Sequence, residues 1–125
     1  VLEPLSGYLL LGEKLLGDPI TYATSFNFGP LISANKPVLE VVQRLVQYYG
    51  KGKVIDISDP NAVHENILLS VDVTKAYLML DWQAKWGLQD AIEKTVDWYQ
   101  AALTNNDMYD FCVQQIQEHF GKVVN

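Results

Sequence analysis

Residues 64–99 read HENILLSVDVTKAYLMLDWQAKWGLQDAIEKTVDWY, and this stretch carries the clearest structural signals of the sequence. It predicts a short strand from Ile67 to Val71, followed by a helix that Asp72 opens. A carboxylate at such a position can accept hydrogen bonds from amides that the first helical turn leaves without partners. A turn containing tryptophan then leads into a long amphipathic helix that begins near Leu88.

The long helix separates apolar from polar side chains by face. One set recurs at steps of three and four residues, which is the period of a single helix face. The members of that set are Leu88, Ala91, Ile92, Thr95, Val96 and Tyr99, and the residues on the solvent side are Gln89, Asp90, Glu93, Lys94, Asp97 and Gln100. Large aromatic side chains bury much area, so we expect the core to contain Trp82, Trp86 and Trp98.

Two elements are predicted near the start of the chain. Apolar side chains between Leu2 and Leu16 form two neighbouring stripes, which indicates a helix covered on more than one side. Glu3 suits its first turn, because a carboxylate there meets the positive end of the helix dipole. Residues Tyr22–Phe28 are rich in aromatic and β-favouring types and precede Gly29-Pro30, so they predict a strand.

A helix and a strand follow in the middle of the chain. Pro37 opens a helix in which Glu40 and Arg44 lie one turn apart, and Gly50 ends it. Residues 53–57 alternate polar and apolar side chains, which predicts a half-buried strand paired with the strand at residues 67–71.

The last predicted element is a helix that Asn105-Asn106-Asp107 caps and Gly121 closes. The predicted fold class is therefore α+β, mainly helical with a few short strands. The whole chain, residues 1–125, is expected to form one domain.

Composition narrows the class of protein. The chain is 49% hydrophobic and 19% charged, which is typical of a globular domain. Its net charge is −6 and Arg44 is its single arginine, so a basic footprint for nucleic acid is missing. The lone Cys112 permits no internal disulfide, which fits a cytoplasmic protein. No apolar run approaches the roughly 20 residues that span a bilayer.

Common catalytic motifs are missing from the sequence. His64-Glu65 begins like a zinc-protease helix, but Leu68 stands where the second histidine is required. The sequence contains neither a Gly-x-Ser-x-Gly elbow, nor a P-loop, nor a glycine-rich dinucleotide fingerprint, nor a Tyr-x-x-x-Lys pair. Cys112 falls on the core face of the last helix, as a structural thiol does. We therefore expect neither a metal site nor a catalytic residue in this chain.

Four segments together resemble the C-terminal part of the extended short-chain dehydrogenase/reductases that act on nucleotide sugars. They are VLEPLSGYLLL at residues 1–11, FNFGP at residues 26–30, His64-Glu65, and KTVDWY at residues 94–99. Within that family the sequence is most similar to the CDP-glucose 4,6-dehydratases. The resemblance covers nearly the whole chain and depends on the register of these segments rather than on one motif.

The resemblance implies a parent enzyme, a lyase that converts CDP-glucose to CDP-4-keto-6-deoxyglucose with loss of water. In such enzymes an N-terminal Rossmann domain binds NAD and carries the catalytic tyrosine, lysine and acid. Their motifs do not occur here, so we expect no cofactor-binding residue in this chain and an N-terminal domain in the parent. The expected partners are the nucleotide sugar, that Rossmann domain and further copies of the parent, with neither nucleic acid nor membrane.

The resemblance also implies three substrate-binding residues. Glu65 corresponds to an acidic residue that accepts hydrogen bonds from the nucleotide ribose, and His64 beside it corresponds to the neighbourhood of the diphosphate. Asn27 follows the predicted strand where related enzymes close near the active-site crevice, in a supporting role. From the residues alone, Glu65 also fits a solvated loop carboxylate and Asn27 a turn former.

Two other functions remain open. The parent could be another nucleotide-sugar dehydratase or epimerase, for instance one that acts on GDP-mannose, because residues outside this chain read most of the nucleotide base. Alternatively, the chain could be a non-enzymatic helical module that docks on a partner through the wide apolar helix at residues 2–16.

Overall fold

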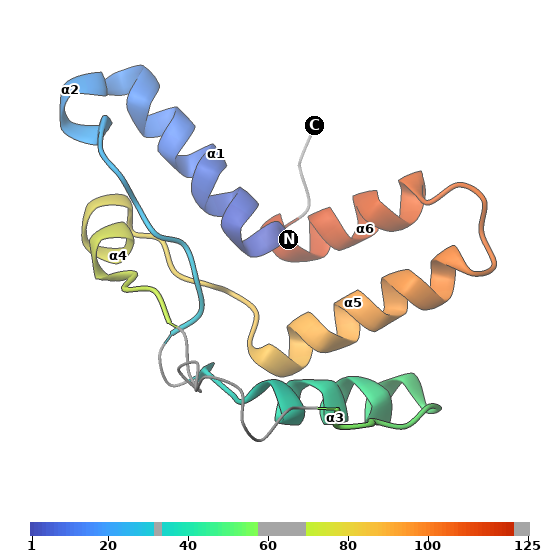
Figure 1. Ribbon diagram of the computed structural model, residues 1–125. Coiled ribbons are helices and arrows are strands. Elements are labelled where there is room, and N and C mark those ends of the chain that lie inside the picture. Colours follow the sequence, from blue (N-terminus) through green and yellow to red (C-terminus); the bar gives the residue numbers. More distant parts are fainter. Residues whose placement is uncertain (32–33, 58–69, 122–125) are drawn as a thin grey trace. The chain divides into compact units, whose positions relative to one another are not determined.

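The computed structural model describes residues 1–31, 34–57 and 70–121. Over these ranges the chain is mainly helical and forms no strand (Figure 1). The helices are α1 (Leu2–Gly17), α2 (Pro19–Tyr22), α3 (Val38–Tyr49), α4 (Thr74–Leu80), α5 (Leu88–Ala102) and α6 (Tyr109–Phe120). They divide between two compact units, one built from the chain up to residue 35 with residues 70–87, the other from residues 36–57 and 88–121.

The first unit has its core where α1, α4 and the segment after α4 meet. Ala76, Leu80 and Trp82 are buried there, with 0%, 2% and 4% of their surface exposed. Half-buried side chains of α1, of α2 and of the irregular stretch at residues 23–31 pack around them. The sequence predicts an apolar face of Val73, Ala76, Tyr77 and Leu80 for the helix after Asp72. Of these residues α4 buries Ala76 and Leu80, whereas Tyr77 is 52% exposed.

Phe28 occupies the space that a side chain at Gly7 would need. A Cβ built on Gly7 would overlap the ring of Phe28, and Gly7 is the buried residue of α1. The same ring meets Trp82 edge-on at 5.0 Å between centroids and Tyr8 edge-on at 5.4 Å. Edge-to-face pairs at these separations are favourable beyond the area they bury. Phe28 therefore joins α1 to the segment that follows α4.

Polar groups at the start of α1 reinforce this junction. The indole N–H of Trp82 donates to Ser6 Oγ at 2.8 Å, so the buried ring keeps a hydrogen bond. The Glu3 carboxylate accepts from the amides of Lys85 and Trp86 at 3.0 and 2.8 Å. Glu3 thus satisfies backbone donors 82 and 83 residues away along the chain, beyond the helix-end role that its position predicts.

The second unit consists of α3, α5 and α6. Figure 1 shows α5 between the other two helices, and both pack against it. Ile92 and Val96 of α5 are its buried apolar residues, 5% and 3% exposed, and both belong to the predicted core face. Trp98 is half-buried, and its indole N–H donates to Cys112 Sγ of α6 at 3.3 Å. The sequence-based prediction of Cys112 on the inner face of the last helix is confirmed.

The predicted capping carboxylates bond the first amide of their helices, each from the residue before the N-cap position, which is Val73 in α4 and Met108 in α6. Asp72 Oδ1 accepts from the Thr74 amide at 2.8 Å, and Asp107 Oδ1 accepts from the Tyr109 amide at 2.8 Å. Gly50 ends α3 in the left-handed conformation with φ of 81°, which only glycine adopts at little cost. Glu40 and Arg44 form the predicted pair, with 2.6 Å between Arg44 Nη2 and Glu40 Oε1.

The predicted strands are wrong for the part of the chain that the structure describes. Asp18 caps a helical turn by accepting from the Thr21 amide at 3.1 Å, so Tyr22 ends α2 instead of starting a strand. Residues 23–31 then run without regular structure, because their aromatic rings pack onto α1 and α4 rather than pairing with a strand. Residues 53–57 are exposed throughout and irregular, and most of their predicted partner lies outside the described residues.

The fold class is accordingly corrected from α+β with a few short strands to mainly helical over the described ranges. None of the described helices has the length and apolar character needed to cross a membrane.

Two glycines of α1 provide a test of the Phe28 contact. Gly7→Ala is expected to lower the free energy of unfolding by about 1–3 kcal/mol, because the new methyl group overlaps the Phe28 ring. Gly12→Ala is the matched control, since a Cβ there meets no atom within 4 Å. It should raise the free energy of unfolding by roughly 0.5–1 kcal/mol through helix propensity alone. Urea titrations measure both, and equal effects of the two substitutions would contradict the packing described.

Candidate functional site

Of the three residues predicted to bind substrate, Asn27 lies in the part of the chain that the structure describes. It lies exposed in the irregular stretch after α2, and its Nδ2 donates to the carbonyl oxygen of Asp72 at 3.2 Å. The carboxylate of the same Asp72 caps α4, and the hydrogen bonds from Thr74 lower the pKa of that carboxyl. Asn27 is therefore tied to the N-terminal end of α4.

Lys75 holds the three residues before Asn27. Its ammonium donates to Thr24 Oγ1 at 2.7 Å and to the Ser25 carbonyl oxygen at 3.0 Å, and it lies 5.0 Å from the centroid of the Phe26 ring. These contacts could not be expected from sequence patterns, because Lys75 is some 50 positions from its partners. The predicted site residues Glu65 and His64 lie outside the described residues.

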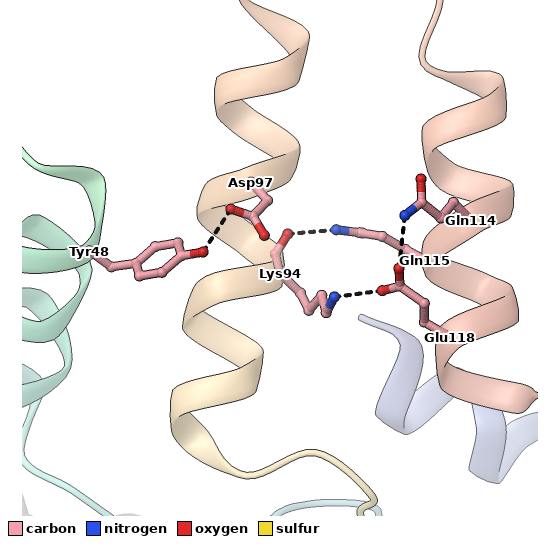
Figure 2. A network of polar contacts seen from close by, with 6 residues as sticks. All are labelled: Tyr48, Lys94, Asp97, Gln114, Gln115 and Glu118. Carbon is pink, nitrogen blue, oxygen red and sulfur yellow. Dashed lines mark hydrogen bonds and ion pairs between the residues drawn. The ribbon is translucent and has the colours of Figure 1, made fainter.

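A polar hollow of about 370 Å³ lies between α5 and α6 in the second unit. Its lining consists of Lys94, Asp97, Gln100, Ala101, Phe111, Gln114, Gln115 and Glu118. Figure 2 shows Lys94 and Asp97 on α5, with Glu118 and the two glutamines facing them from α6. The Lys94 ammonium pairs with Glu118 at 2.5 Å, and Gln115 Nε2 donates to the Lys94 carbonyl oxygen at 2.8 Å.

Each charged group near this hollow already has a partner. The hydrogen bond from Lys94, followed by that from Gln114, lowers the pKa of the Glu118 carboxyl, and the Glu118 contact raises the pKa of Lys94. Asp97 accepts from the Tyr48 hydroxyl of α3 at 3.1 Å, which raises the pKa of Tyr48 (Figure 2). These pairs join α5 to both neighbouring helices. The charged side chains around the hollow therefore stabilise the packing of the helices.

This cluster is not predicted by the sequence. Lys94 and Asp97 fall on the predicted solvent side of their helix, and polar residues on two helices give no sign that they pair across 24 positions. The signal that could have found the cluster is the spacing of Lys94, Asp97 and Ala101, which lie on one helix face.

A second polar hollow, of about 550 Å³, is lined by Arg44, Gln47, Tyr48 and Gln89. Two of its donors are engaged, since Arg44 pairs with Glu40 and Gln89 Nε2 donates to Glu93 at 2.9 Å. In the described part of the chain, no group of three histidine, cysteine or acidic side chains is placed to hold a metal ion. The two hollows can form hydrogen bonds with hydroxyl groups, but their lining residues offer no nucleophile with an adjacent base.

Comparison with known proteins shows that the chain is similar in sequence to a nucleotide-sugar dehydratase. The protein concerned is the CDP-glucose 4,6-dehydratase of Salmonella typhimurium strain LT2, and the chain is 30% identical to it over 119 residues. The match takes in 95% of this chain and lies in the C-terminal part of that enzyme. The chain spans about one third of the length of this curated relative, 33%. No protein-family model matches the chain.

The predicted resemblance to the C-terminal part of CDP-glucose 4,6-dehydratase is thereby confirmed. Asn27 and the α4 contacts that hold it lie in the first unit, whereas the polar hollows belong to the second.

The Lys94–Glu118 pair makes a pH-dependent contribution to stability that can be tested. Because the folded-state pKa of Glu118 lies below its ordinary value of 4.5, this contribution is present above pH 4.5 and is lost as the pH falls through the lowered value. Glu118→Gln should therefore lower the melting temperature at about pH 7, with a difference that shrinks once the pH falls below 4.5 and through the lowered pKa, so that it is smaller at about pH 3.

Glu13→Gln is the control for that experiment, since Glu13 is exposed and forms no ion pair with a described residue. It should leave the melting temperature nearly unchanged at both pH values. Added salt should shrink the Glu118→Gln effect, because both side chains are about one third exposed. An effect of the same size at pH 3 would show that charge is not its cause.

Proposed function

We propose that this chain is the substrate-binding C-terminal domain of an enzyme similar to CDP-glucose 4,6-dehydratase. The observation that carries the proposal is the 30% identity to that dehydratase, which extends over 95% of the chain. In the proposed reaction CDP-glucose loses water and becomes CDP-4-keto-6-deoxyglucose. NAD and the catalytic groups belong to a Rossmann domain of the same cytoplasmic, homo-oligomeric enzyme, and this chain supplies contacts to the nucleotide sugar.

Three residues make the proposed substrate contacts. Glu65 binds the hydroxyl groups of the nucleotide ribose, and His64 lies near the diphosphate. Asn27 supports the substrate from the stretch that Lys75 and Asp72 hold. A carboxamide suits this role because it donates and accepts hydrogen bonds, as sugar hydroxyls do.

Steady-state kinetics of the full-length protein test the substrate and Glu65 together. The wild-type protein is expected to convert CDP-glucose in the presence of NAD. GDP-mannose is assayed in parallel and is expected not to be converted. Glu65→Ala removes one or two charge-assisted hydrogen bonds, worth about 1.5–3 kcal/mol, so KM should rise roughly tenfold to a hundredfold. The ribose is remote from the reacting carbons, so kcat should change far less.

The control is a thermal melt of the Glu65→Ala protein, which should match the wild type because the proposed role of Glu65 is a contact to the ligand. An unchanged KM would contradict the ribose contact proposed for Glu65. Turnover of GDP-mannose but not of CDP-glucose would transfer the proposal to the related dehydratases.

The exposed apolar face of α1 and α2 favours a second candidate, a helical module that docks on a partner. Leu9, Leu16 and Ile20 are exposed over 67%, 90% and 93% of their surface. An apolar surface of this kind marks an interaction site when its members are contiguous. In the dehydratase proposal, the Rossmann domain of the same enzyme covers this face.

The 125-residue chain is therefore expected to bind an apolar fluorescent dye and to self-associate at high concentration. The double substitution Leu9→Glu and Leu16→Glu should abolish most of both effects. Ile57→Glu, at a position that is 90% exposed outside this face, should change neither. Light scattering and dye titration measure the outcome, and a monomeric, dye-silent wild-type chain would contradict both uses of the face.

A further inference from the structure

The ammonium of Lys75 is the one charged group that holds the stretch leading into Asn27, among the residues the structure describes. It contacts three consecutive residues in three different ways, through the Thr24 hydroxyl, the Ser25 carbonyl and the Phe26 ring. Hydrogen bonds from a charged donor are stronger than neutral ones, and a cation over an aromatic face adds to them. Residues 23–31 lack regular structure, so no strand or helix holds their backbone in place. The contacts of Lys75 take that role for residues 24–26.

Asn27 follows directly and is fixed by a contact of its own. One N–H of its carboxamide donates to the Asp72 carbonyl, and Asp72 lies one helical turn before Lys75. The amide oxygen and the second N–H make no hydrogen bond to any described residue, and the side chain is exposed. The carboxamide is thus oriented by one hydrogen bond while keeping an acceptor and a donor for a ligand.

A third contact closes the far side of the same stretch. A Cβ built on Gly29 would lie 2.8 Å from Val71 Cγ2, so the backbone approaches the segment before α4 closely there. Residues 24–29 therefore contact residues 71–75 at three points. These points lie before Asn27, at Asn27 itself and after it. Removing Lys75 would release the approach to Asn27 while leaving in place Ala76, Leu80 and Trp82, the buried residues against which Phe26 packs.

We propose that Lys75 is a positioning residue for nucleotide-sugar binding, which holds residues 24–26 so that the Asn27 carboxamide presents its remaining acceptor and donor to substrate hydroxyl groups. This inference rests on the proposed function and adds a residue to it. Lys75 itself does not touch the substrate. Its effect reaches the substrate through Asn27.

The test uses the full-length protein with Lys75→Met, Asn27→Ala and the double variant, each assayed with CDP-glucose. Losing the hydrogen bonds that Asn27 offers should raise KM about twofold to tenfold, with kcat changed less than twofold. Lys75→Met should reproduce that rise, and Lys75→Arg, which keeps charge and donors, should reverse most of it. Because Lys75 acts through Asn27, the double variant should be no worse than Asn27→Ala alone.

Lys51→Met is the matched control, since Lys51 also lies over an aromatic ring, 5.4 Å from the centroid of Tyr49, but belongs to the other unit. It should leave KM unchanged. A Lys75→Met enzyme with wild-type KM, or effects of Lys75→Met and Asn27→Ala that multiply in the double variant, would overturn the positioning role. A wild-type protein inert toward CDP-glucose would instead overturn the proposed function, and with it this use of Lys75.

Discussion

The ring of Phe28 against Gly7 is the contact on which the first unit depends. The ring can lie there because α1 has no side chain at that position, and one residue earlier Ser6 supplies the acceptor that the buried indole of Trp82 requires. A single turn of α1 thus provides both the space for one aromatic ring and the hydrogen bond for another. The irregular stretch at residues 23–31 can remain irregular because this ring anchors it.

The helices could be predicted from the sequence because their signals are local. The caps at Asp72 and Asp107 act on amides two residues away, and Gly50 ends α3 through its own φ. The strand predicted at residues 22–28 failed because β propensity reflects side-chain packing on a pleated surface. Here the aromatic rings found helices to pack on, while the Asp18 cap had already drawn Tyr22 into α2.

The candidate sites could be predicted only where one residue carried the signal. Asn27 was singled out from the register of a short segment and its role stays a prediction, whereas Lys75 and the Lys94–Glu118 pair depend on partners 24 to 51 positions away. A polar side chain on a solvent face looks the same in the sequence whether it contacts water or another helix. The tryptophans illustrate the same limit, because Trp82 is buried while Trp86 and Trp98 are half-buried.

The start of α4 connects this local chemistry to the proposed function. The Asp72 carboxylate caps the helix, the carbonyl of the same residue accepts from Asn27, and the next turn carries Lys75. A cap that fixes the first turn of α4 therefore also fixes the two groups that hold the stretch proposed to face the substrate. One oxygen of the capping carboxylate accepts from Thr74, whereas the Asn27 carboxamide keeps both an acceptor and a donor after its bond to Asp72. The orientation of the Asn27 carboxamide thus depends on the N-terminal end of α4, although no ligand needs to contact that helix.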